Sequence, residues 1–192
     1  IYFEKGHWVG VRGNIAHYQT IDDRCVQDAM IHNKSLAVKV ALGQKVDIMG
    51  GLHHYVFWGG TRRGSDVPEP HSFSDYFKIF FAKRGGEDAS ISDQMNALGN
   101  HLGCEWIRLV WRADAFTINF QYDKPLEDNS GKNFQNVPDG VWTLQLSGKK
   151  RDAFITDVTY EFIGTTWQSG TVHDRPATPE EMEKQDPDDP YY

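Results

Sequence analysis

The sequence predicts an all-β fold, an antiparallel transmembrane β-barrel or a large part of one. Strict alternation is the first observation: residues 116–122 place Phe, Ile, Phe and Tyr on one face, separated by Thr, Asn and Gln. Strand length is the second, because several alternating runs reach about ten residues, closer to the roughly 9–11 of membrane barrels than to the usual 5–6 of globular proteins. Alternation alone also fits a soluble sandwich with one wet face.

About seven strands are expected along the chain, with one or two short helices in a long connection. Phe73, Tyr76, Phe77 and Phe80 recur at helical spacing, and Ser72 with Asp75 forms a capping-box pattern. This helix should end at Gly85-Gly86. A second short helix is expected over 90–98, with its apolar side chains directed inward. The expected strands cover 1–19, 30–42, 46–58, 107–112, 116–122, 141–149 and 154–163.

Charge and composition narrow the classes of function. The chain has a net charge of -7, whereas binding to nucleic acid requires a cluster of basic residues on the surface. No nucleic-acid partner is therefore expected. Residues 1–170 are expected to form a barrel segment with helices around 72–98, and 171–192 an acidic, Pro-rich loop. The chain is expected to be a piece of a longer protein. Cys25 and Cys104 could pair, or could be two unrelated thiols.

Enzyme and metal motifs are weak. His53 and His54 are adjacent on an expected strand, so their rings point to opposite faces and should not share a metal ion. Asp157 and Glu161 lie roughly 13 Å apart along one strand at 3.3 Å per residue, beyond the about 5–9.5 Å of glycosidase pairs. We therefore expect no catalytic residues and no cofactor. The tryptophans could stack on sugar, face lipid or fill a core.

Four stretches carry a family resemblance: Gly51–Gly60 (GLHHYVFWGG), Leu98–Gly103 (LGNHLG), Pro138–Trp142 (PDGVW), and Tyr160–Phe162 with Thr165 and Gln168–Gly170. In this order they resemble the capsule assembly Wzi family of bacterial outer-membrane proteins. The resemblance implies an outer-membrane barrel of roughly 18 antiparallel strands, with helices on its periplasmic side and in its lumen. It also implies retention of capsular polysaccharide by non-catalytic binding.

The resemblance makes capsular polysaccharide and outer-membrane lipid the expected partners, and the bacterial outer membrane the expected location. A passive outer-membrane pore and a soluble β-rich carbohydrate-binding or hydrolytic domain remain alternatives. The polar and aromatic residues of the matching stretches are the candidate polysaccharide-binding residues: His53, His54, Trp58, Asn100, His101, Asp139, Glu161 and Gln168.

Overall fold

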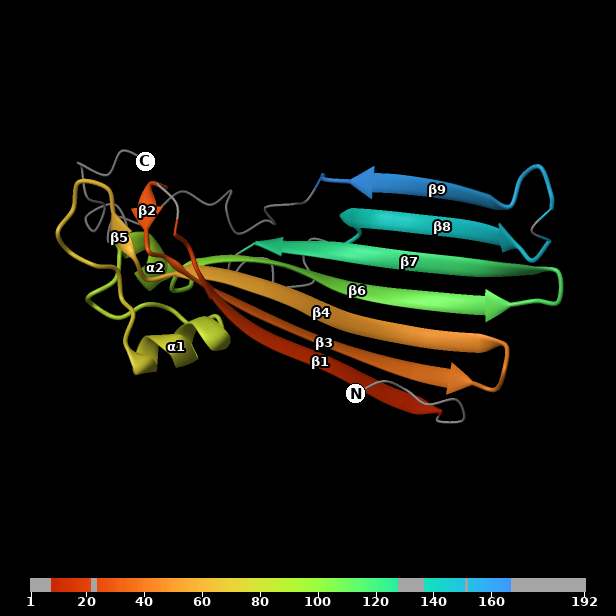
Figure 1. The fold of residues 1–192 in the computed structure, drawn as a ribbon, viewed down its shortest axis with the longest axis horizontal. Coiled ribbons are helices and arrows are strands. Elements are labelled where there is room, and N and C mark those ends of the chain that lie inside the picture. The colour runs from red at the N-terminus through yellow and green to blue at the C-terminus, as the bar shows by residue number, and fades with distance from the viewer. Residues whose placement is uncertain (1–7, 22–23, 128–136, 151, 167–192) are drawn as a thin grey trace.

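The computed structural model describes residues 8–21, 24–127, 137–150 and 152–166 (Figure 1). Seven long strands form one antiparallel sheet, and their order in the sheet follows their order in the chain. The expected antiparallel all-β architecture is therefore confirmed. Within the described residues the sheet is open, with the first and last strands at its edges. The strands are β1 (Val9–Gln19), β3 (Met30–Leu42), β4 (Val46–Trp58), β6 (Asn100–Arg112), β7 (Phe116–Glu127), β8 (Gly140–Gly148) and β9 (Asp157–Gly164).

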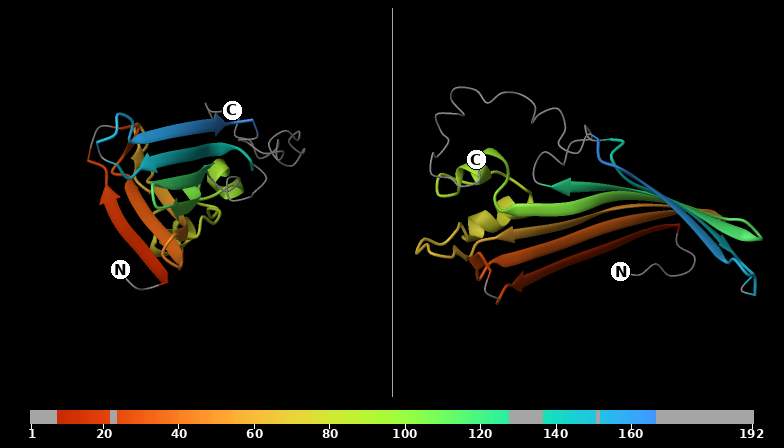
Figure 2. Two further views of the ribbon diagram at one scale, coloured as in Figure 1. Left: turned by 90° about the vertical axis from the view of Figure 1, so that its right-hand side faces the viewer. Right: turned by 90° about the horizontal axis from the view of Figure 1, so that it is seen from above.

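The two ends of the sheet differ in their connections. At one end, which we call the short-turn end, residues 43–45 join β3 to β4 and residues 113–115 join β6 to β7. At the other, the long-connection end, residues 59–99 join β4 to β6 and contain β5 (Thr61–Arg62), α1 (Phe73–Phe80) and α2 (Ile91–Met95). There β5 pairs with β2 (Val26–Gln27) of the β1–β3 connection. Figure 2 shows that the sheet twists strongly between its ends.

Strand register gives the sheet a continuous apolar surface near the short-turn end. Directly opposed residues of neighbouring strands share a face, so each row of partners crosses the whole sheet. Three adjacent rows on one face are almost entirely apolar, and most of their side chains are exposed. We call these rows the apolar belt: Leu42, Val46, Trp111, Ile118, Leu146 and Val158; then Val9, Val40, Ile48, Leu109, Phe120, Leu144 and Tyr160; then Val11, Val38, Gly50, Ile107, Tyr122, Trp142 and Phe162.

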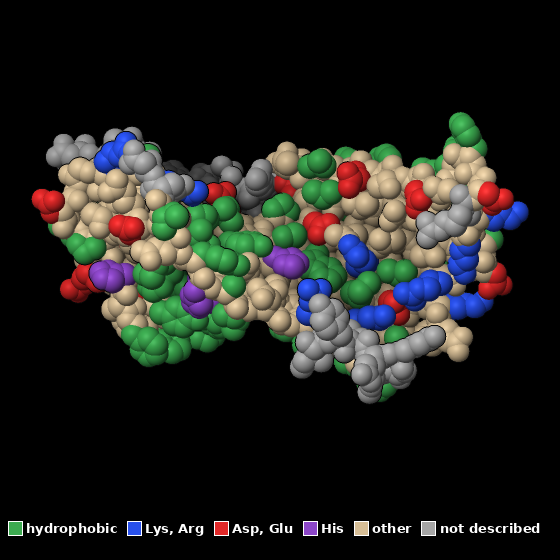
Figure 3. All heavy atoms as spheres, in the orientation of Figure 1, with side chains coloured by type: hydrophobic (Ala, Val, Ile, Leu, Met, Phe, Trp, Pro, Cys, Tyr) green, Lys and Arg blue, Asp and Glu red, His purple; other side chains and the backbone are tan. Residues whose placement is uncertain are grey.

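The reverse side of the same rows is polar, and we call it the polar face. Arg108 donates from Nε to Oε1 of Gln121 at 2.5 Å, and Gln121 donates in turn to the carboxylate of Asp123. A second group joins Asp47 to Lys39, with Nζ to Oδ2 at 2.9 Å, and to Arg112. Figure 3 shows Lys and Arg side chains gathered over this half of the sheet. The sheet therefore separates an apolar from a charged surface.

At the long-connection end, the belt side of the sheet is covered by helices and by a small core. Ile79 of α1 is 0 % exposed and packs with Val56, Trp58 and Leu98. The predicted capping box is confirmed, because Ser72 accepts from the backbone N–H of Asp75 and the Asp75 carboxylate accepts from Ser72. None of the described helices is long and apolar enough to cross a membrane.

The helix predictions need three corrections. α1 ends at Phe80, well before the glycine pair, and Ala82 then adopts a φ of 45°. The apolar stripe of α1 also divides, because burial of Ile79 turns Tyr76 inward and leaves Phe73 and Phe77 exposed. α2 spans Ile91–Met95 alone, and its Met95 is exposed rather than inward.

Candidate functional site

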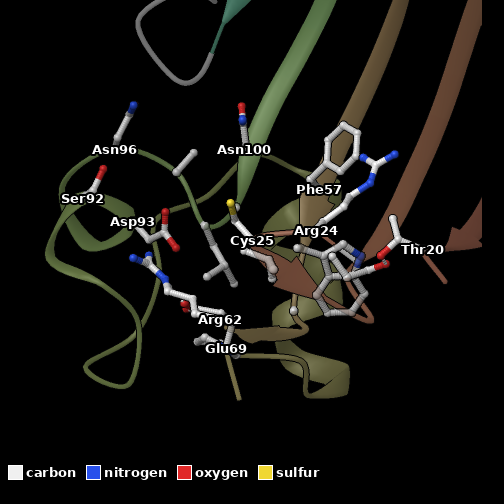
Figure 4. A pocket seen from close by; sticks show the side chains of 18 of the residues that line it. Thr20, Arg24, Cys25, Phe57, Arg62, Glu69, Ser92, Asp93, Asn96 and Asn100 are labelled. Atoms are coloured by element: carbon white, nitrogen blue, oxygen red, sulfur yellow. Dashed lines mark hydrogen bonds and ion pairs between the residues drawn. The ribbon is translucent and has the colours of Figure 1, made fainter. Parts of the chain in front are cut away.

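A pocket of about 530 Å³ opens at the long-connection end (Figure 4). Its volume lies within the about 300–1,000 Å³ of small-molecule sites. The wall comes from six places: the β1–β3 connection, the end of β4, β5 and the residues after it, the segment around α2, the start of β6 and the end of β7. Polar and aromatic side chains that line it include Thr20, Arg24, Cys25, Phe57, Trp58, Arg62, Glu69, Asp93, Asn96 and Asn100.

Glycines allow the strands to turn at the pocket wall. Gly60 follows β4 with a φ of +84°, and a Cβ there would lie 2.5 Å from the carbonyl oxygen of Gln27. Gly99 precedes β6 with a φ of +84°, and its Cβ would lie 2.5 Å from the carbonyl oxygen of Phe57. Positive φ and this close backbone approach both demand glycine. These glycines therefore shape the backbone that carries Trp58 and Asn100.

Charged groups face one another across the pocket floor. Arg62 donates from Nε to Oε1 of Glu69 at 2.7 Å. Burial raises the pKa of Asp93, and the nearby charge of Glu69 adds to the rise. The backbone N–H of Gly99, the Ser90 hydroxyl and the charge of Arg62 oppose that rise without cancelling it. Asp93 therefore holds its proton more tightly than an ordinary aspartate.

The pocket chemistry suits a polyhydroxylated ligand. Carboxyl, amide, guanidinium and hydroxyl groups offer donors and acceptors at many angles, and sugar hydroxyls can use both. Phe57 and Trp58 add aromatic surface at the end of β4. This mixture of apolar wall and convergent polar groups is typical of binding sites for neutral or weakly charged small molecules.

Two of the predicted residues form a buried histidine pair beside the pocket. His54 Nε2 lies 2.9 Å from His101 Nδ1, and His101 Nε2 lies 2.9 Å from the carbonyl oxygen of Leu98. A carbonyl only accepts, so in the neutral pair His101 donates from Nε2 and its Nδ1 accepts from His54. His54 is 5 % and His101 0 % exposed. The pair therefore ties β4 to β6 and holds Leu98, which lines the pocket.

The remaining predicted residues lie elsewhere. His53 is on the polar face, stacked on Trp106 with ring centroids 6.4 Å apart, so the two adjacent histidines do point to opposite faces. Glu161 is also on the polar face and accepts from the Thr143 hydroxyl at 3.3 Å. Asp139 is buried beside a separate cavity of about 60 Å³. Gln168 lies outside the described residues, as does the acidic segment 171–192.

The structure thus places Trp58 and Asn100 on the pocket wall and distributes the other described candidates over the sheet. Sequence reasoning missed Arg24, Arg62 and Asp93. Asp93 lies three residues after Ser90, and this spacing predicts a helix cap but gives no signal for a pocket residue. Cys25 and Cys104 are both free thiols. Within the described ranges, no group of three or more His, Cys, Asp or Glu side chains could hold a metal ion.

Comparison of the chain with protein-family models, with curated proteins and with solved structures gave no match.

Proposed function

We propose that this chain forms part of the wall of an outer-membrane β-barrel that helps to assemble or retain capsular polysaccharide, without catalysis. The observation that carries the proposal is the apolar belt, which crosses all seven strands on one face while the polar face lies behind it. Membrane barrels have this arrangement, with an apolar band toward lipid and polar side chains toward the lumen.

Hydrophobic energetics favour lipid as the surrounding of the belt. Leu109, Leu144 and Tyr160 lie in its central row, and each is more than 40 % exposed. A continuous apolar surface of this kind is unfavourable in water and marks a protein or membrane contact. Hydrocarbon removes that cost. On the polar face, Asp47 forms ion pairs with both Lys39 and Arg112, as charges lining a lumen can.

The saccharide part of the proposal has two supports. The four sequence stretches resemble the Wzi family, whose members retain capsular polysaccharide. The pocket then offers Trp58, Asn100, Arg62 and Asp93, groups suited to sugar hydroxyls, at the long-connection end of the sheet. In this proposal the long-connection end holds a saccharide segment while the belt anchors the sheet in the membrane.

Detergent dependence tests the membrane part. The full chain should aggregate in buffer alone and remain monodisperse in detergent. A chain that is monodisperse without detergent would overturn the proposal and would favour the soluble β-rich domain.

Capsule retention tests the saccharide part. Disruption of the gene should release capsular polysaccharide into the medium, and Arg62→Ala with Asn100→Ala should reproduce part of that release. Fully cell-attached capsule, together with large conductance of the reconstituted protein, would instead support a passive pore, which the polar face also favours.

A further inference from the structure

Helix α1 exposes an aromatic stripe. Phe73, Phe77 and Phe81 recur every four residues along α1 and its C-cap, and they are 78 %, 47 % and 60 % exposed. Phe73 and Phe77 meet edge to face with ring centroids 5.1 Å apart. Figure 3 shows hydrophobic side chains gathered over α1. Three adjacent exposed phenylalanines form an apolar patch, and such patches mark sites of contact with protein or membrane.

The stripe is fixed outward by the packing of the opposite side of α1. Ile79 is fully buried, and Tyr76 packs against the same core beneath the helix. Lys34 of β3 donates from Nζ to the carbonyl oxygen of Phe80, and its ammonium lies 4.2 Å from the centroid of that ring. Turning the phenylalanines inward would break these contacts, so their exposure is a property of the docked helix.

α1 lies on the belt side of the sheet, closer to the long-connection end than the belt itself, whereas the family resemblance implies helices on the periplasmic side and in the lumen. Along β1, the exposed residue Ile15 is followed on the same face by His17, and His17 and His32 are cross-strand partners. The Tyr76 ring covers both histidines, with centroids 5.3 Å and 5.5 Å away. α1 therefore covers a row of the sheet that contains two histidines and presents exposed phenylalanines in its place.

The apolar surface of the sheet alone is shorter than the apolar band of a membrane barrel. On the same face, exposed apolar residues continue past the belt to Ile15 on β1 and to Leu36 on β3, so the apolar stretch runs from Val9 to Ile15 and from Leu36 to Leu42. Six residues span about 20 Å along a strand, or about 15 Å along the membrane normal at a tilt of about 40°. The apolar band of a membrane barrel is about 25 Å tall. An α-helix about 10 Å across supplies the missing height.

We infer that α1 is an interfacial helix that inserts Phe73, Phe77 and Phe81 among lipid acyl chains at the membrane surface and so extends the apolar belt. The inference rests on the proposed membrane location of the sheet. Amphipathic helices bury an apolar face in this way at the boundary between head groups and acyl chains. Lys83 and Arg84 follow the stripe and are exposed, with Lys83 Nζ 6.0 Å from the Phe81 ring, so their charges can reach the head groups.

Depth-dependent fluorescence quenching tests the inference. The full chain, with Cys25→Ser and Cys104→Ala, receives one environment-sensitive label, either at Ser74→Cys beside the stripe or at Leu109→Cys in the belt. It is reconstituted into phosphatidylcholine vesicles whose acyl chains carry bromine, either close to the head group or deep in the chain. The label at 74 should be quenched more by shallow bromine, and the label at 109 more by deep bromine.

Substitutions separate the stripe from the belt. F73S/F77S/F81S should abolish quenching at 74 and leave quenching at 109 and the far-UV circular dichroism unchanged. The matched control I21S/V67S removes exposed apolar side chains at the same end of the sheet but off α1, and it should change neither label.

The outcomes distinguish the two proposals. Quenching at 109 with a label at 74 that is accessible to aqueous iodide overturns the interfacial helix and retains the membrane wall. A label at 74 that is shielded from both bromine and iodide is covered by protein, which also overturns the inference. Absence of bromine quenching at both positions overturns the membrane proposal itself.

Discussion

A pair of adjacent arginine substitutions tests which face of the sheet meets lipid. Leu109 and Val110 are neighbours on β6, but Leu109 lies in the central row of the apolar belt and Val110 on the polar face, opposite Asp47. Leu109→Arg places a cation in the middle of the apolar belt. Val110→Arg places the same cation beside a carboxylate. The two variants therefore match in charge, size and strand position.

The expected magnitude follows from the location of each residue. An arginine on the lipid face of a membrane barrel costs about 2–4 kcal/mol at the bilayer midplane, which corresponds to an about 30- to 900-fold change in the unfolding equilibrium at RT of about 0.59 kcal/mol. If the belt faces water, Leu109 is an ordinary exposed residue, and its substitution should change stability by less than about 0.5 kcal/mol. Val110→Arg should change stability by less than about 0.5 kcal/mol in either case.

Urea unfolding of the full chain in phosphatidylcholine vesicles, followed by tryptophan fluorescence, measures the difference. We expect Leu109→Arg to lower the free energy of unfolding and Val110→Arg to leave it nearly unchanged. Equal and small effects of both variants would refute the lipid-facing belt. A larger effect of Val110→Arg would show that the two faces are assigned the wrong way round.

Three further predictions concern the packing and the pocket. Ile79→Ala should weaken docking of α1 by about 2–5 kcal/mol, because a fully buried side chain leaves a cavity; hydrogen exchange should then accelerate in α1 but not in the belt strands, and unchanged exchange would contradict the role of Ile79. Gly51→Ala should destabilise the sheet by about 1–3 kcal/mol, since its Cβ would lie 2.6 Å from the Leu36 carbonyl oxygen and 2.8 Å from the Trp106 ring; an unchanged urea midpoint would refute this close packing. Because burial raises the pKa of Asp93 above the ordinary value of an aspartate, the folded state binds more protons than the unfolded state between the two pKa values, and stability should fall as pH rises through that window. Asp93→Asn should remove this part of the pH dependence, and a pH profile identical to that of the parent would exclude the carboxyl as its source.

The strands could be predicted because their cause is local. In 116–122 the alternation of apolar and polar side chains shows which residues share a face of the strand. The register then places the apolar residues of neighbouring strands on the same face of the sheet. The ends of the strands were harder to predict from the sequence. β6 begins at Asn100 rather than near Ile107, because His101 and Gly103 in its first half interrupt the apolar alternation. His101 pairs there with His54, which belongs to a different strand.

The pocket and the orientation of α1 depend on tertiary contacts that no local pattern contains. Arg62 and Asp93 lie 31 positions apart in the chain and share the pocket because the 59–99 segment folds back on itself. Likewise, helical spacing groups Phe73 with Tyr76 as one apolar surface. The position of Ile79 against Val56 decides which part of that surface is buried. Such choices follow from packing among distant residues rather than from periodicity.

The order of the strands has a consequence for how the sheet assembles. Each long strand pairs with the preceding one, so the sheet can grow by adding consecutive strands, with three-residue turns at β3–β4 and β6–β7. The step from β4 to β6 differs, since residues 59–99 intervene where residues 43–45 suffice between β3 and β4. Closing that longer loop costs about 2 kcal/mol more in chain entropy. Docking of α1 through Ile79 can offset this cost, which makes the helical connection the step at which assembly of the two halves of the sheet is coupled.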